Sequence, residues 1–255
     1  MTLTTPCTSS IIKKGAGIMR VVTAGKITGS IIVEEGGFYF SGLTAGSLFN
    51  DTKPITANGS SVLLGQAYIT SLTANSGSTL KPRATLSETS PGTIIATGTI
   101  AVNEGATLDM LLSASKQSKL QGKWVSVKGI LKVTLAEGYT PAAGDSFTLW
   151  EASSSFSGTP TIDLPTLSNN LAWDTSELLA KTGVLKVVAG SGIGAIASDA
   201  TVKCEVYTAN GQKVAQFEAP KSRVEENLQG ISSDTRTLIV RMVAGNRMEV
   251  KKVIR

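Results

Sequence analysis

The chain of 255 residues contains no histidine. Histidine is the usual general acid–base of enzymes and the commonest metal ligand, so Ser-His-Asp catalysis, Cys-His catalysis and imidazole-based zinc sites are excluded. The two cysteines, Cys7 and Cys204, are far apart in the sequence. Two thiols do not make a disulfide framework. A single disulfide between them is the alternative, but we favour the interpretation that both are isolated buried thiols.

Charged residues are also scarce, at 17% of the chain against about 25% in typical domains. Serine, threonine and glycine fill the gap, a mixture that favours short strands joined by tight turns. Apolar residues make up 41% of the chain and the mean hydropathy is +0.13, which argues against global disorder. The length indicates one or two domains.

Long apolar runs are missing as well, so we expect no transmembrane segment. The first residues, MTLTTPCTSSIIKKGAG, do not have the order of a signal peptide, a basic region followed by an apolar one. Because other features below indicate secretion, we expect the chain to be the C-terminal part of a longer protein.

The net charge of +5 is concentrated near the end of the chain. Residues 200–255 contain ten Lys/Arg and six Asp/Glu, which gives +4 of that total. No nucleic-acid-binding motif accompanies this excess, so we interpret it as a solvated basic face and expect no nucleic-acid partner.

Short β-rich runs separated by Gly, Asn, Ser and Pro predict many short strands. They are residues 18–22, 31–33, 38–40, 62–64, 93–95, 100–102, 124–127 and 130–135. The one helical candidate is a short turn over 174–181, which Asp174 could cap.

An internal repeat points to the architecture. TGSIIVEEGG, from Thr28 to Gly37, and TGTIAVNEGA, from Thr97 to Ala106, are identical at six of ten positions with an offset of 69. A partial copy, NSGSTLKP, spans 75–82, and Gly36, Gly77 and Gly105 occupy the matching turn. Irregularly spaced repeats favour a parallel β-solenoid over the alternative, an antiparallel sandwich.

The composition changes near residue 190. Residues 190–198 are rich in Gly, Ala and Ser, which is typical of a linker between a solenoid over 1–189 and a second domain over 199–255. The second domain contains an Asn-Gly hairpin at 209–211 and another hairpin over 237–254. At least four antiparallel strands predict a small β-sandwich.

The first domain resembles a known family. SGSTLKP, SPGTIIATGTIAVNEGATLDMLL, GILKVTLAEGYTPAAGDSFTLW and LAWDTSELLAKTGVLKVV follow the order seen at the end of autotransporter-type passengers with autotransporter-associated β-strand repeats. The resemblance covers close to half the chain. It implies a right-handed parallel β-helix closed by a terminal cap.

The tail from about Thr201 resembles the C-terminal sorting domain of the type IX (Por) secretion system. The matching segments are VYTANGQKV, LQGI, LIVRMVAGNR and the terminal KKVIR, while the usual Gly-x-Tyr is replaced by residues 235–238. The resemblance implies an immunoglobulin-like sandwich, engagement of the type IX machinery, and release from the cell or attachment to its outer surface.

Candidate catalytic groups are few. Asp145 and Asp174 could form a carboxylate pair for glycoside hydrolysis, but both lie in turn contexts where Asp caps the backbone. Lys81-Pro82-Arg83 could face a polyanion, although a solvated loop is the preferred interpretation. We therefore predict no catalytic, cofactor-binding or metal-binding residue.

Two further patterns are weak. The glycine pairs at 15–17 and 190–194 lack the Lys-Ser/Thr and the helix of a phosphate loop. Trp124, Trp150 and Trp173 could form a sugar-stacking platform, but core packing is preferred.

These observations predict an all-β, non-enzymatic protein, secreted or held at the bacterial surface. The solenoid would be structural or adhesin-like, with a surface polysaccharide or host glycan as a partner, and the sandwich would be its sorting signal. The alternatives are the non-catalytic tail of a polysaccharide-degrading β-helix enzyme and a carbohydrate-binding module, which would show a row of exposed aromatics.

Overall fold

The computed structural model describes residues 2–3, 8–23, 27–42, 53–168, 171–189, 200–231, 237–244 and 247–254. The chain divides into two compact units, Met1–Leu167 with Trp173–Val188 and Ser168–Ala172 with Ala189–Arg255. The predicted linker at 190–198 lies outside the described residues. No described helix is long and apolar enough to cross a membrane.

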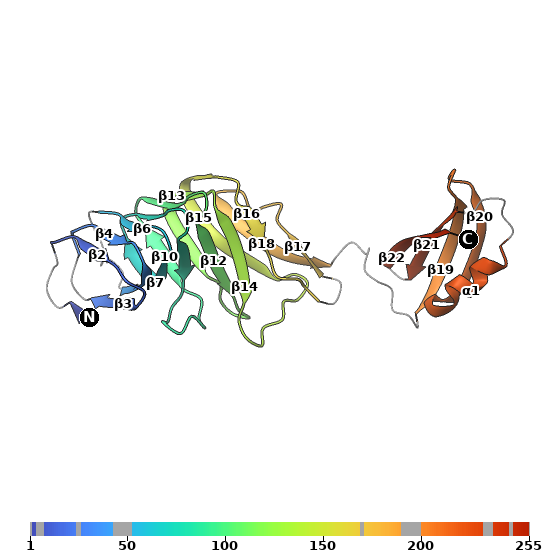
Figure 1. Ribbon diagram of the computed structural model, residues 1–255, viewed down its shortest axis with the longest axis horizontal. Coiled ribbons are helices and arrows are strands. Elements are labelled where there is room, and N and C mark those ends of the chain that lie inside the picture. Colours follow the sequence, from blue (N-terminus) through green and yellow to red (C-terminus); the bar gives the residue numbers. More distant parts are fainter. Residues whose placement is uncertain are drawn as a thin grey trace. The chain divides into compact units, whose positions relative to one another are not determined.

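The first unit is a stack of parallel strands that pair in three ladders (Figure 1). Ladder 1 contains β2 (Ile11–Lys13), β4 (Ile31–Val33), β6 (Ile55–Ala57), β8 (Leu72–Ala74), β11 (Thr99–Val102) and the second halves of β13 (Lys119–Val127) and β15 (Ser146–Ser157). Ladder 2 contains β3 (Ile18–Thr23), β5 (Gly36–Gly42), the first half of β7 (Ser61–Ile69), β9 (Thr79–Pro82), β12 (Thr107–Leu112), β14 (Ile130–Leu135) and β16 (Thr161–Asp163). Ladder 3 contains β1 (Thr2–Leu3), the ends of β3 and β5, the second half of β7, β10 (Thr93–Ala96) and the first halves of β13 and β15.

The core of this unit is a set of aliphatic columns, because side chains alternate across each strand and like positions stack from rung to rung. In ladder 1 the column is Ile31, Ile55, Leu72, Ile100 and Val125, all of them buried. In ladder 2 the buried column is Phe38, Leu63, Leu80, Leu108 and Leu131. The predicted parallel solenoid, and each of the eight predicted strands, is confirmed.

The repeat seen in the sequence corresponds to one structural position three rungs apart. Its strands are β4 and β11 in ladder 1, separated by β6 and β8. Each copy then turns into ladder 2 through a glycine with positive φ, +69° at Gly36 and +74° at Gly105. Other residues are strained at such φ values, which explains why the glycines recur at this turn.

An asparagine ladder runs along the same corner and was not anticipated. The amide of Asn75 donates to Asn58 Oδ1 at 2.8 Å, and the amide of Asn103 donates to Asn75 Oδ1 at 2.8 Å. Each asparagine follows a ladder 1 strand, so the three side chains stack in register and hold successive turns together.

The solenoid ends in an antiparallel pair. Residues Ser146–Glu151 of β15 pair with β18 (Thr182–Ala189), and β17 (Leu171–Asp174) precedes β18. Trp150 is fully buried, donates its indole N–H to the Ala180 carbonyl at 3.0 Å and stacks on Phe156 with ring centroids 4.8 Å apart. The short turn expected over 174–181 is present as hydrogen-bonded turns at residues 176–179, and no regular helix forms there.

The second unit is a four-stranded antiparallel sheet with the order β20-β19-β21-β22. Its elements are β19 (Thr201–Thr208), β20 (Lys213–Pro220), the 3-10 helix η1 (Lys221–Arg223), α1 (Val224–Gln229), β21 (Thr237–Ala244) and β22 (Arg247–Ile254). Both predicted hairpins are confirmed, and Gly211 has a φ of +83° in the first turn.

A short helix, absent from the sequence prediction, covers one face of this sheet. Val224 and Leu228, one turn apart on α1, pack with Val206, Val240 and other buried residues of the sheet. Cys204 belongs to the same core and is a free thiol whose pKa is raised by burial. Cys7 lies outside the described residues.

Candidate functional site

A surface groove of about 620 Å³ lies on the outer side of ladder 3, over β10, β13 and β15. The strand register places Ile95, Gln121, Glu151 and Thr182 in one row across β10, β13, β15 and β18. Tyr68 of β7 extends the row at its other end. Since neighbouring residues point inward, for instance the buried Leu120, these side chains form the outer surface.

The polar floor of the groove is fixed by hydrogen bonds to one carboxylate. Glu151 Oε1 accepts from Lys119 Nζ at 2.7 Å, and Glu151 Oε2 accepts from the Gln121 amide at 2.6 Å. These hydrogen bonds, with Lys119 the stronger influence, lower the pKa of the Glu151 carboxyl below its usual range. The carboxylate is therefore ionised and held in one orientation beside the amide.

A β-bulge shapes the rim of the groove. The amides of Lys123 and Trp124 both donate to the Gly98 carbonyl, at 3.0 Å and 3.3 Å, and the β13–β15 register shifts here. Lys123 of β13 then faces two residues of β15, Ser153 and Ser154. The strand turns here, so the side chains of Lys123 and Trp124 are both exposed. Trp124 is 43% exposed, and Lys123 Nζ lies 4.3 Å from the centre of its ring.

The tryptophans expected as a platform or as core have three different environments. Trp150 is in the core, and Trp173 is half-buried and donates to the Pro165 carbonyl at 2.8 Å. Core packing is thus confirmed for Trp150. It is wrong for Trp124, which the bulge turns outward.

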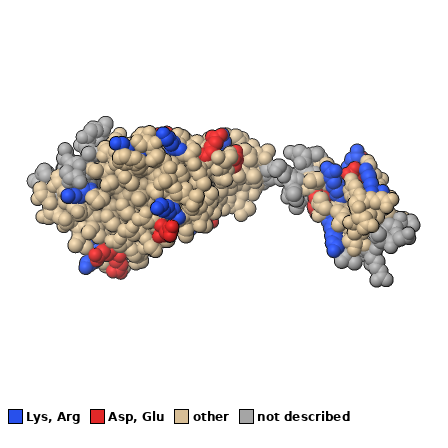
Figure 2. All heavy atoms as spheres, turned by 90° about the horizontal axis from the view of Figure 1, so that it is seen from above, with Lys and Arg blue, Asp and Glu red and all other residues tan. Residues whose placement is uncertain are grey.

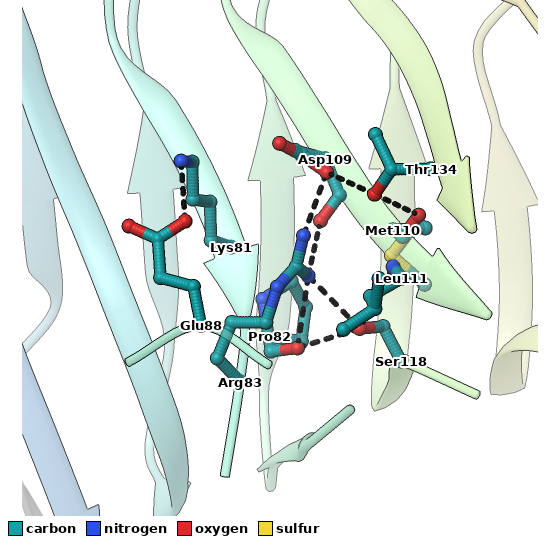
Figure 3. Close-up of polar contacts among 9 residues, drawn as sticks. All are labelled: Lys81, Pro82, Arg83, Glu88, Asp109, Met110, Leu111, Ser118 and Thr134. Carbon is teal, nitrogen blue, oxygen red and sulfur yellow. Dashed lines mark hydrogen bonds and ion pairs between the residues drawn. The ribbon is translucent and has the colours of Figure 1, made fainter. Parts of the chain in front are cut away.

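The expectation of a solvated loop at Lys81-Pro82-Arg83 is wrong for Arg83, which is 2% exposed. Figure 3 shows its side chain directed toward Asp109 and Ser118. Arg83 Nη2 is 2.7 Å from Asp109 Oδ1, and its Nη1 donates to the Asp109 carbonyl and to Ser118 Oγ at 2.9 Å and 3.0 Å. Ser118 Oγ donates in turn to the Pro82 carbonyl at 2.6 Å. Arg83 therefore anchors the loop after β9 and does not face a polyanion.

Lys81 has a different role from Arg83. Its Nζ is 2.6 Å from Glu88 Oε2, a partly exposed ion pair at the base of the same loop. The Lys81 ammonium therefore interacts with Glu88 of its own loop (Figure 3).

Asp145 and Asp174 both cap turns, as preferred from the sequence. Asp145 Oδ2 accepts from the Ala142 amide at 2.8 Å and from the Tyr139 hydroxyl at 2.6 Å. These bonds lower the Asp145 pKa, with the Ala142 amide the larger cause. Asp174 Oδ1 accepts from the Ser176 amide at 2.9 Å, which lowers its pKa. Each carboxylate is used by its own turn.

Of the two glycine segments, the structure describes only the first. Residues 15–17 form the turn between β2 and β3, and 190–194 lie outside the described residues. Within the described ranges, no group of three or more Cys, Asp or Glu side chains could hold a metal ion.

The groove residues were missed because their proximity depends on register. Gln121 and Glu151 are thirty residues apart, and no motif links them. The bulge had a visible signal, since adjacent Lys123 and Trp124 break the alternation of the run 119–127.

No protein-family model matches the chain, and no curated protein matches it.

Proposed function

We propose that this protein is a non-enzymatic β-helix, secreted or held at the outer surface of a bacterial cell, and that its second unit is a type IX sorting signal. The solenoid is the structural or adhesin-like cargo. The observation that carries the proposal is the pairing, in one chain, of a parallel β-helix with a separately cored antiparallel unit at its C-terminal end.

The solenoid suits a structural role outside the cell. Its stability comes from rungs that each pair with their neighbours, so rigidity needs no metal, cofactor or disulfide framework. The last parallel rung is followed by the antiparallel β15–β18 pair, which protects an edge that would otherwise template aggregation.

The second unit suits recognition by strand addition. β20 and β22 are the two edges of its sheet, and an edge strand offers unpaired backbone groups to a partner. Lys252 on β22 and Lys203 on β19 are exposed, and Figure 2 shows basic side chains gathered on the visible face of this unit. The type IX machinery is the proposed partner.

The test is to fuse residues 189–255 to a secreted reporter in a host with the type IX system, and to measure the reporter in the periplasm, at the surface and in the medium. The intact fusion should reach the surface or the medium. Deleting residues 251–255 should stop export, because it removes the half of β22 that pairs with the start of β21.

Because that deletion also weakens the fold, Lys252→Glu provides the second variant. Lys252 is exposed, so the unit should keep its circular dichroism spectrum while export falls. The matched control is Arg223→Glu on η1, the same change of charge at an exposed residue that belongs to neither edge of the sheet. A folded, intact fusion that stays in the periplasm would overturn the sorting role.

A further inference from the structure

We infer that the groove over β10, β13 and β15 binds an oligosaccharide that carries carboxylate groups, a uronic-acid-containing glycan. The inference deepens the proposed surface role and rests on it for where such a glycan would be met. The binding itself is a property of the first unit alone.

The size of the groove fits a small ligand. Its volume of about 620 Å³ falls within the range of about 300–1,000 Å³ that is usual for such sites. The floor comes from three adjacent strands of ladder 3, so regular backbone pairing holds it in place. A site built on strands needs little reorganisation when it binds.

The polar groups of the floor match hydroxyl groups. Gln121 donates one amide hydrogen to Glu151, which leaves its second N–H and its carbonyl oxygen for a ligand. The Glu151 carboxylate accepts from Lys119 and Gln121 and has further lone pairs. A sugar hydroxyl both donates and accepts, so fixed donors and acceptors side by side suit vicinal hydroxyls.

Ile95 supplies the apolar contact that a sugar ring needs. It lines the groove from β10, beside Gln121 in the strand register, and is only partly buried. Trp124 lies outside the groove lining. Its ring contacts the Lys123 ammonium, which helps to hold the Lys123 side chain at the groove edge.

The charge balance favours an acidic glycan over a neutral one. The Lys119 charge is offset by Glu151, whereas Lys123 forms no ion pair with any residue that the structure describes. One uncompensated ammonium beside a hydroxyl-binding floor fits a carboxylate on a sugar ring. It does not fit a nucleic acid, whose closely spaced phosphates require several cations.

The experiment is isothermal titration of the purified full chain with two sets of oligosaccharides. The acidic set is from alginate, polygalacturonate and hyaluronan, and the neutral set is from laminarin, xylan and dextran. At least one acidic set member should bind, and raising the salt concentration should weaken it. Binding to none, or only to neutral members, would overturn the inference.

Three variants place the binding in the groove. Ile95→Ala, Lys123→Ala and Gln121→Ala should each weaken binding about tenfold or more. Lys128→Ala and Ile130→Ala are the controls, because both residues are exposed on the same rungs but do not line the groove. Equal binding by the Lys123→Ala protein and the wild type would overturn the site.

This assay does not depend on export. If the chain binds acidic glycans but the reporter is not exported, the glycan site is supported and the sorting role is overturned. If the reporter is exported but no acidic glycan binds, the sorting role is supported and the glycan site is overturned.

Discussion

Arg83 and Asp109 form a buried ion pair, 2.7 Å between Nη2 and Oδ1, that ties the loop after β9 to strand β12. Thr134 Oγ1 adds a hydrogen bond to the same carboxylate at 3.2 Å, from β14 of the next rung. The pair therefore joins three consecutive rungs of ladder 2 at the corner where the loops leave the solenoid.

Replacing Arg83 by Ala should lower the free energy of unfolding by about 3–5 kcal/mol, because Asp109 would remain buried without its partner. Urea unfolding followed by circular dichroism measures the change. The control is Lys81→Ala, which breaks the partly exposed pair with Glu88 and should cost at most about 1 kcal/mol. Equal losses in the two variants would contradict a buried role for Arg83.

The double variant Arg83→Met with Asp109→Leu should recover much of that loss, because neither charge is then left unpaired in the interior. A double variant no more stable than Arg83→Ala would show that the hydrogen bonds to Ser118 and to the Asp109 carbonyl matter more than the charge pair.

The asparagine ladder predicts that loss of Asn75 lowers the free energy of unfolding more than loss of Asn103. Asn75 takes part in two side-chain hydrogen bonds with its neighbours and Asn103 in one, so Asn75→Ala should cost about 1–3 kcal/mol and Asn103→Ala about half as much. Urea unfolding of the two variants under the same conditions tests the order. A larger loss for Asn103→Ala would show that the two bonds do not contribute separately.

Features that repeat along the chain were predictable from the sequence. The copies beginning at Thr28 and Thr97 share strand, turn and glycine, since each rung meets the same packing requirement as its neighbours. The hairpin around Gly211 was predictable because its Asn-Gly turn is a local signal.

Features that depend on register between distant residues were not predictable. The sequence around Arg83 indicates a polar loop. Asp109 is 26 residues away, and only the pairing of β9 with β12 brings it next to the Arg83 side chain. The helix α1 has six residues, too few for a periodic signal, and it is held by burial of Val224 and Leu228. The row Gln121–Glu151 has the same origin in strand register.

The close approach of Gly183 to Trp150 predicts a steric effect. A Cβ atom at Gly183 would lie 2.1 Å from the indole Cε2, so Gly183→Ala should displace the ring and cost about 1–3 kcal/mol. The matched control is Gly17→Ala, where a Cβ meets no atom within 4 Å, and its effect should be within about 0.5 kcal/mol. Urea unfolding and the emission maximum of tryptophan fluorescence report the two effects. An unshifted emission in Gly183→Ala would contradict displacement of Trp150.

The turn capped by Asp145 predicts the acid sensitivity of the solenoid end. The pKa of Asp145 is lowered in the folded protein by the Ala142 amide first and the Tyr139 hydroxyl second. A carboxyl whose folded pKa is depressed stabilises the fold above its unfolded pKa, and that contribution is lost as the pH falls through the folded value. Stability should therefore decline below about pH 4, and Asp145→Asn should flatten the decline.

Tyr139→Phe tests the cause of the lowered pKa at Asp145. It removes the 2.6 Å hydrogen bond, so the folded pKa of Asp145 should rise toward its ordinary value and the acid-induced loss attributable to Asp145 should become smaller. Asp163→Asn, which removes an exposed carboxylate at the end of β16, serves as the control and should leave the decline close to that of the wild type. Urea unfolding at pH values from about 2.5 to 7 supplies the comparison. If Asp145→Asn and Asp163→Asn gave the same pH profile, the Asp145 turn would not contribute to acid sensitivity, and the decline would have to come from carboxylates elsewhere, of which Glu151 in the groove is the next to test.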